Sequence, residues 1–544
     1  MKKNSFVQGA MIATIAIILV KILGVLYVIP FYAIIGEQGG ALYGYAYTIY
    51  TLFLSISSIG LPSAMAKIIS EYNTLEKYYL KEKAYKIGKK LMLITGFASF
   101  LMLFIFAPNI AYMILGDITG GNSIEDVTLV IRIISTAIII VPLLSITRGY
   151  LQGHKYITPS SISQVLEQLI RVLIIIIGSY MVLNVFNLGL TNAVGIAVFG
   201  ATAGAFVSYF YLVSKIKKNK IHQEYEMTRS EKRVTSKDIL KKLVIYAIPF
   251  VMIHITHSFY NLIDMTTVVK TLVNGLKYEI DVAESVIGIL NTWGYKLNAI
   301  VIAISSGLVT SLIPNITSNF VQKDFENVRR KVSQSLKLLT FITLPLTFGL
   351  SFLAKPLWFA FYGESVLGPT VFSYSIFIAF FITLFTITLM IMQSLNQYKM
   401  VFISLIAGLL IKLSFNIPLM YSFNHFGLHG FYGSITATIF GFIVSIIINL
   451  IVLKKITNIS YNDTFKTFLN IVMGTLIMLI VLSMLKLLIP IDVTGRGMAV
   501  IVCFVYGIIG SGIYLALSKQ NNTITSVLGN NITINMLKKS KKEV

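Results

Sequence analysis

Long apolar runs recur along almost the whole chain, from Phe6 to Leu517, and they restrict the folds that the chain can adopt. Each run spans about 20 residues or more, the length that crosses a hydrocarbon core of roughly 30 Å as a helix. Hydrophobic residues make up 56% of the 544 positions and charged residues only 12%, which excludes a soluble globular protein. The sequence therefore predicts an all-α, polytopic membrane protein.

About fourteen transmembrane helices are expected from these runs. Their predicted ranges are Phe6–Ile35, Gly44–Tyr72, Gly88–Leu115, Val127–Leu151, Thr158–Phe186, Thr191–Val213, Leu243–Leu272, Val286–Ile316, Leu336–Tyr362, Thr370–Leu395, Val401–Ser422, Phe431–Leu453, Phe465–Ile489 and Met498–Leu517. The first run continues to Ile35 without a small-residue cleavage site, so it is interpreted as a membrane helix and not as a cleaved signal peptide.

The placement of charge predicts the orientation in the membrane. The formal net charge is +23, and the cations gather in alternate loops, at Lys77–Lys90, Lys215–Lys242 and Lys323–Lys331. The other loops hold acids instead, namely Glu37, Asp117, Glu125, Asp126, Glu279, Asp281, Glu284, Glu364 and Asp492. This positive-inside pattern predicts a multi-pass protein with both termini in the cytoplasm and argues against nucleic acid as the partner.

A weak internal repeat predicts the domain organisation. Phe186, Gly204 and Ser208 match Phe423, Gly441 and Ser445 at one constant offset, which carries the fifth and sixth predicted helices onto the eleventh and twelfth. A repeat of six helices is parallel, with its pseudo-twofold axis along the membrane normal. The expected divisions are a six-helix lobe at 1–214, a basic cytoplasmic linker at 215–242, a second six-helix lobe at 243–455, two terminal helices at 456–518 and a basic cytoplasmic tail at 519–544.

Four cations, Lys21, Arg171, Lys296 and Lys412, stand in the middle of predicted membrane helices. A cation at mid-bilayer costs roughly 2.5–3.5 kcal/mol on insertion scales, so it normally faces a wet cavity or a partner. Lys21, Arg171 and Lys296 are predicted to bind an anionic head group. Glu167 and Arg171 are four residues apart on one helix face, which predicts a contact that is either a structural ion pair or a gate for cargo.

Other charged residues have weaker claims to function. Asp264 is expected either to neutralise Lys296 or to bind a coupling cation, Na⁺ or H⁺. Lys412 is either a cavity cation or an interhelical partner within the second lobe. Arg132 and Lys67 are weaker candidates for substrate binding, because both side chains can reach a membrane interface.

Catalytic and metal-binding patterns are lacking in the sequence. There is no GxxxxGK[ST] phosphate loop, so ATP hydrolysis by this chain is not expected. His254 and His257 lack a neighbouring ligand at metal-like spacing, and Cys503 is the single cysteine. Transport without covalent chemistry, catalytic residues, metals or bound cofactors is therefore predicted.

Two stretches resemble a known family. They are Lys21-Ile-Leu-Gly24, Tyr27, Ile29-Pro30 with Ile35-Gly36-Glu37-Gln38-Gly39, and Arg148-Gly149-Tyr150-Leu-Gln-Gly153 with Ser163-Gln164-Val-Leu-Glu167-Gln168-Leu-Ile-Arg171. The chain resembles the polysaccharide-transport branch of the MOP exporter superfamily, and is most similar there to stage V sporulation protein B and the MurJ-type lipid II flippases of Gram-positive bacteria. Val28 departs from the pattern, since relatives commonly carry a basic residue there.

The resemblance implies a MATE-like fold with a basic central cavity and alternating access, in which Lys21 and Lys296 occupy suitable places. It also implies a bacterial cell-membrane protein whose cargo is an undecaprenyl-pyrophosphate-linked glycan, with lipid II of peptidoglycan synthesis as the leading candidate. We expect a monomer. The alternatives are another lipid-linked polysaccharide unit, a cation-coupled multidrug exporter, a glycan-modifying enzyme and a nonenzymatic scaffold.

Overall fold

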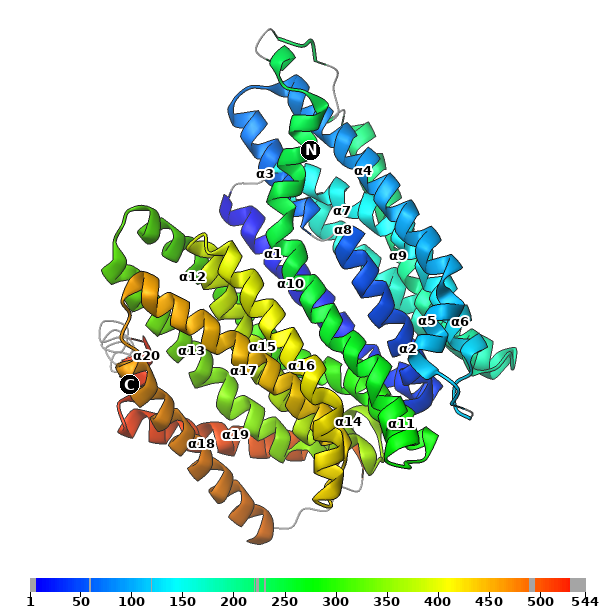
Figure 1. Cartoon of the computed structure of the whole chain (residues 1–544), viewed down its shortest axis with the longest axis vertical. Coiled ribbons are helices and arrows are strands. Elements are labelled where there is room, and N and C mark those ends of the chain that lie inside the picture. The colour runs from blue at the N-terminus through cyan, green and yellow to red at the C-terminus, as the bar shows by residue number, and fades with distance from the viewer. Residues whose placement is uncertain are drawn as a thin grey trace. The chain divides into compact units, whose positions relative to one another are not determined.

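Helices form every regular element in the described part of the chain (Figure 1). The computed structural model describes residues 6–57, 60–118, 120–219, 221, 225–228, 231–488 and 495–528. Twelve spans among these residues are long and apolar enough to cross a membrane. Each of the fourteen predicted helices overlaps a helix of the structure, so the prediction of an all-α polytopic membrane protein is confirmed. Asp492 and positions 529–544 of the predicted tail lie outside the described residues.

The helices fall into two compact units, Met1–Trp293 and Gly294–Val544. The first contains α1 Phe6–Leu26, α2 Val28–Ser57, α3 Leu61–Thr74, α4 Tyr78–Ile105, α5 Ala107–Leu115, α6 Ile124–Ser135, α7 Ala137–Gly153, α8 Ile157–Leu173, α9 Leu190–Lys218, α10 Ser236–Lys270 and α11 Ile280–Gly288. The second contains α12 Gly294–Val321, α13 Phe325–Phe352, α14 Ala354–Tyr362, α15 Leu367–Ser394, α16 Tyr398–His425, α17 Phe431–Thr457, α18 Asn462–Leu488, α19 Arg496–Gln520 and α20 Thr523–Leu528. Single π-helical turns extend α8, α10 and α11 at Ile174–Gly178, Thr271–Gly275 and Ile289–Trp293, and a further one lies at Met181–Val185.

The boundary between the compact units differs from the linker expected at 215–242. In the first unit α10 packs against α2, α3 and α4, so the chain after the linker returns to the helices that precede it. Trp293 fixes the end of this unit against α2, because a Cβ added at Gly40 would lie 2.1 Å from the indole Nε1. The division into two six-helix lobes describes an internal repeat and stays a prediction.

The second unit is built around two helix pairs. Helix α16 packs along α17, and α18 packs along α19. Helix α13 contacts both α15 and α18, and apolar side chains of these helices, among them Leu344, Phe380 and Met478, form a shared core. Lys337, midway along α13, donates hydrogen bonds to Asp463 in the first turn of α18 and, at 3.0 Å, to Ser526 Oγ of α20. The two C-terminal membrane helices are therefore anchored to the rest of this unit.

The first two predicted helices divide at a different place in the structure. Helix α1 ends at Leu26, and α2 begins at Val28 and continues to Ser57 with a kink at Gly36. Pro30 lies in the first turn of α2, where its missing N–H removes no helical hydrogen bond. Gly36 has φ +66° and ψ −168°, a conformation available essentially only to glycine.

One hydrogen bond recurs in the two units and supports the predicted repeat. Ser208 Oγ of α9 donates to the Ser163 carbonyl of α8 at 2.9 Å. Ser445 Oγ of α17 donates to the Ser404 carbonyl of α16 at 2.7 Å. Ser208 and Ser445 are a pair that the sequence offset already matched. The α8–α9 and α16–α17 pairs thus share a contact as well as a sequence pattern.

Candidate functional site

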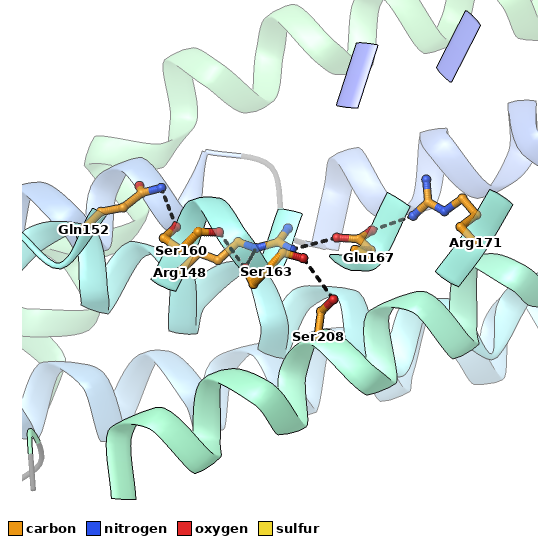
Figure 2. Close-up of polar contacts among 7 residues, drawn as sticks. All are labelled: Arg148, Gln152, Ser160, Ser163, Glu167, Arg171 and Ser208. Carbon is orange, nitrogen blue, oxygen red and sulfur yellow. Dashed lines mark hydrogen bonds and ion pairs between the residues drawn. The ribbon is translucent and has the colours of Figure 1, made fainter. Parts of the chain in front are cut away.

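A carboxylate between two guanidinium groups forms the centre of the candidate site in the first unit (Figure 2). Glu167 Oε1 lies 2.5 Å from an Arg171 Nη2, and Glu167 Oε2 lies 2.9 Å from Arg148 Nη2. The three side chains are only 13–22% exposed. The predicted contact between Glu167 and Arg171 is confirmed, and the group carries one net positive charge inside a membrane-spanning helix pair.

Serine side chains hold this group in place. Ser160, Ser163, Glu167 and Arg171 recur every three or four residues and so line one face of α8. Arg148 Nε of α7 donates to Ser163 Oγ at 2.8 Å, and Ser163 Oγ donates to the Ser160 carbonyl at 2.6 Å. These two hydrogen bonds fix the direction of the Arg148 guanidinium through its Nε.

Close packing of α9 leaves little freedom to the backbone of α8 at this point. A Cβ added at Gly204 would lie 2.6 Å from the Glu167 carbonyl oxygen. Ser208 donates to the Ser163 carbonyl from the same helix, and Gln152 Nε2 of α7 donates to Ser160 Oγ at 3.0 Å (Figure 2). Helices α7 and α9 thus fix the α8 face that carries the charges.

Tyrosines of α2 lie near Arg171. Tyr43, Tyr47 and Tyr50 all lie within electrostatic range of the guanidinium. The rings of Tyr43 and Tyr47 stack with centroids 4.4 Å apart. Arg171 Nε is buried and has no hydrogen-bond partner among the described atoms. A guanidinium with an unused N–H can donate a hydrogen bond to a further anionic group, and its planar fork suits such a group.

Lys21 lies on the helix that covers α8. Helix α1 packs against α8, where a Cβ at Gly24 would approach Gln168 Nε2 to 3.7 Å. Lys21 is three residues before Gly24, and its side chain is exposed. The structure therefore places Lys21 on the helix next to the Arg171 face, and its predicted role in binding an anion remains a prediction.

Lys296 and Asp264 lie in different compact units. Lys296 stands near the start of α12, and Asp264 lies in α10. Both side chains are partly buried. The expected neutralisation of Lys296 by Asp264, and the alternative role of Asp264 in ion coupling, both stay predictions.

Lys412 is fully buried between α16 and α17. Its ammonium donates to Asn416 Oδ1 at 2.8 Å, to the Ser434 carbonyl at 2.9 Å and to Thr438 Oγ1 at 2.6 Å. These contacts correspond to the interhelical partner considered from the sequence. Lys412 follows Ser404 at the spacing at which Arg171 follows Ser163, so the two units place a cation at matching points and surround it differently.

Lys67 and Arg132, the two cations that the sequence placed lowest as candidates for the site, lie beside aromatic rings. Lys67 of α3 is exposed, with its ammonium 4.0 Å from the Tyr246 ring centroid. Arg132 of α6 has its guanidinium carbon 5.2 Å from the Phe104 ring centroid, and its Nε lies 3.4 Å from the Phe104 carbonyl oxygen. Both contacts are local packing interactions.

Arg148 is the member of the cluster that the sequence did not select. It stands three residues before the predicted end of the fourth membrane helix, where a cation is normally taken to reach the interface. Its partner Glu167 lies on the next helix, so helical spacing gives no signal for the pair. The Arg148-Gly149-Tyr150 motif was the one available signal. Among the described residues no group of three His, Cys, Asp or Glu side chains could hold a metal ion, and the side chains of His254 and His257 lie outside them.

A protein-family model and two relatives of known name match most of the chain or a large part of it. A family model described as "Polysaccharide biosynthesis protein" matches residues 6–320. The chain is 30% identical to the lipid II flippase MurJ of Bacillus subtilis over 97% of both chains, and 26% identical to stage V sporulation protein B of the same organism over 62% of this chain and 63% of that protein. These relatives confirm the resemblance noted in the sequence.

Solved structures agree on the fold. An inward closed structure of lipid II flippase MurJ superposes with a TM-score of 0.68 at 18% identity, over 93% of this chain and 98% of that chain. An inward-facing multidrug resistance MATE family transporter of the MOP superfamily gives a TM-score of 0.62 at 12% identity, over 82% and 98% of the two chains. At these identities the likeness shows the fold alone, and it confirms the MATE-like architecture.

Proposed function

This chain belongs to the polysaccharide biosynthesis protein family, and on that premise we propose that it is a flippase that moves lipid II from the inner to the outer leaflet of the bacterial cell membrane. The observation that carries the proposal is the full-length similarity to a lipid II flippase, at 30% identity over 97% of the chain. The intramembrane cluster of Arg148, Glu167 and Arg171 supports it, because its net charge suits an anionic cargo.

The head group is the part of such a cargo that needs a protein. An undecaprenyl tail partitions favourably into hydrocarbon, whereas a pyrophosphate with sugars is strongly hydrated and costly to move across it. Arg171 and Lys21 of the first unit bind the pyrophosphate and replace its water with fixed cations, and Lys296 is the anion-binding cation of the second unit. Glu167 orients Arg171 and Arg148 and prevents two like charges from repelling each other when the site is empty.

Alternating access and the membrane potential complete the cycle. With both termini in the cytoplasm, an inside-negative potential favours outward movement of an anion by about 2.3 kcal/mol per charge per 100 mV. Return of the empty carrier is coupled to Na⁺ or H⁺ through Asp264. An exporter of cationic drugs would use acidic side chains in its cavity, and the basic cluster argues against that activity.

Native mass spectrometry of the purified protein tests the cargo. The protein is offered equal amounts of lipid II and of an undecaprenyl-linked polymer repeat unit, with Arg171→Ala and Lys21→Ala as variants and Lys399→Ala, an exposed cation in the second unit, as the control. We expect selective lipid II binding that both variants weaken and the control retains. Preference for the polymer unit would assign the protein to polysaccharide export, and binding of neither would overturn the proposal.

A further inference from the structure

A large pocket lies at one end of the second unit, away from the helix pair that holds Lys412. It has a volume of about 730 Å³ and is formed by the end of α13, by α14, by the start of α15 and by residues of α18 and α19. Its walls are mostly apolar, with Phe352, Phe359 and Val502 among them. Long apolar walls of this kind accommodate acyl chains.

Cations stand at the rim of this pocket. Lys355 and Lys486 line it, and both are exposed. The ammonium of Lys486 lies 5.4 Å from the Phe352 ring centroid. Arg496 stands beside it, since a Cβ added at Gly363 would lie 3.5 Å from its guanidinium Nη2. Glu364 also lines the pocket, so three cations and one acid leave the rim with a net positive charge.

The rim also exposes large apolar side chains. Val366, which lines the pocket, is 90% exposed, and Leu487 and Leu488 next to Lys486 are 82% and 78% exposed. Apolar side chains adjoining exposed cations are typical of the boundary between hydrocarbon and head groups. The pocket therefore combines two environments that match the two parts of a lipid.

The position of these cations departs from the charge pattern of the chain. The pocket lies at the end of the unit opposite to Asp463 and Ser526. Asp463 stands at the start of α18 and Ser526 follows α19, whereas the pocket residues Lys486 and Val502 lie near the other ends of these two helices. In the orientation proposed above, the pocket end faces outward, where the positive-inside rule predicts few cations. Lys355, Lys486 and Arg496 thus need an explanation other than topology.

We propose that this pocket binds the phosphate head group of an anionic phospholipid, with its acyl chains along the apolar wall. The three cations hold the phosphate, and each such charge strengthens binding to an anionic lipid by roughly a factor of five. Arg496 supplies the planar fork that suits phosphate oxygens, and the two lysines supply mobile point charges. Assignment to the outer leaflet rests on the proposed orientation, whereas binding itself does not.

Titration of the full-length protein with phosphatidylglycerol, followed by native mass spectrometry, tests the site. The variant K355Q/K486Q/R496Q removes the three charges, and K355R/K486R/R496K keeps them. The matched control K399Q/K466Q/K519Q removes three exposed charges from the other end of the same unit. We expect the first binding step to weaken at least about tenfold in the first variant and to remain within about twofold in the other two, because each lost cation is worth roughly a factor of five.

Three results would overturn the proposal. Equal loss in K355Q/K486Q/R496Q and K399Q/K466Q/K519Q would indicate general charge attraction, and unchanged binding in K355Q/K486Q/R496Q would remove the site. If K355Q/K486Q/R496Q loses lipid II binding but still binds phosphatidylglycerol, the pocket binds the cargo and not a phospholipid. Arg171 and Lys21 lie in the other unit, so a negative phosphatidylglycerol titration would not contradict the flippase proposal. Likewise, the titration can be interpreted even if the protein does not bind lipid II.

Discussion

At the scale of single residues, the balance of charge around Glu167 makes the sharpest prediction. Glu167→Gln leaves two largely buried guanidinium groups without their shared carboxylate, and breaking a buried ion pair from one side costs about 3–5 kcal/mol. We expect a clearly lower thermal unfolding midpoint in detergent. Arg148→Gln keeps the Arg171–Glu167 pair and leaves no unpaired charge, so its unfolding midpoint should fall less than that of Glu167→Gln. It should bind lipid II roughly tenfold more weakly, because a unit charge several ångströms from an anion is worth about 1–4 kcal/mol in a protein.

The two variants separate folding from binding. Thermal unfolding and native mass spectrometry are run on the same preparations, with K399Q as a surface control. If Glu167→Gln unfolds with the wild-type midpoint, the carboxylate does not stabilise the cluster. If Arg148→Gln binds lipid II as well as the wild type, the net charge of the cluster is irrelevant to cargo.

These residues also show how far sequence spacing reaches. The four-residue spacing of Glu167 and Arg171 predicted their contact because a helix fixes which side chains share a face. The contact of Arg148 with Glu167 joins two helices, and their relative rotation depends on packing that no local pattern encodes. Lys412 was visible as a buried cation, but its three oxygen partners include a backbone carbonyl of α17, which spacing along α16 cannot indicate.

At the scale of elements, the kink in α2 depends on one glycine. Gly36 has φ +66° and ψ −168°, and any other residue there is strained by about 1–3 kcal/mol. We expect Gly36→Ala to lower the thermal unfolding midpoint although a Cβ would meet no atom within 4 Å. The matched control is Gly349→Ala in α13, which also has open space but helical backbone, and which should hold or raise the midpoint. Equal effects of the two substitutions would contradict the strain argument.

The segment between α9 and α10 is docked onto α4 through a titratable side chain. Glu231 accepts hydrogen bonds from the Leu80 N–H at 3.4 Å and from Thr228 N and Oγ1 at 2.9 and 2.7 Å. Burial opposes the charge of Glu231, but hydrogen bonds from Thr228, Leu80 and Tyr79 outweigh it and lower the pKa of the carboxyl. The docking is therefore fully present above the unfolded-state pKa of about 4.3 and is lost as the pH falls through the lower folded-state value.

Hydrogen exchange measures this docking directly. We expect the Leu80 amide to be protected at neutral pH and to lose protection only at pH values below the ordinary glutamate pKa, as Glu231 takes up a proton at its lowered pKa. Glu231→Gln should exchange rapidly at every pH. Asp238→Asn is the control, because Asp238 caps α10 through Thr235 and does not contact α4 in the described hydrogen bonds. Protection of Leu80 in Glu231→Gln that equals the wild type would remove Glu231 from the docking.

At the scale of the whole molecule, hydropathy and charge predicted the class of fold, whereas the compact units came only from the structure. Fourteen apolar runs were readable because a helix in lipid must satisfy its own backbone. The end of the first unit depends on Trp293 against Gly40, a contact between two apolar stretches far apart in sequence. Apolar side chains in a membrane protein give the same signal whether they face lipid or another helix, so helix-to-helix packing cannot be inferred from hydropathy.

Orientation in the membrane is the whole-molecule property that charge alone predicts, and cysteine labelling measures it. Cys503, the single cysteine, is first replaced by serine. Glu364→Cys and Lys399→Cys then mark exposed positions at opposite ends of α15, and Lys232→Cys marks the exposed turn before α10. Since cations collect on the cytoplasmic side, a membrane-impermeant maleimide should label E364C in intact cells, and K399C and K232C only after permeabilisation. The reverse pattern would invert the orientation, place the pocket of Lys355 and Lys486 in the inner leaflet and turn the assumed direction of the membrane potential against the cargo.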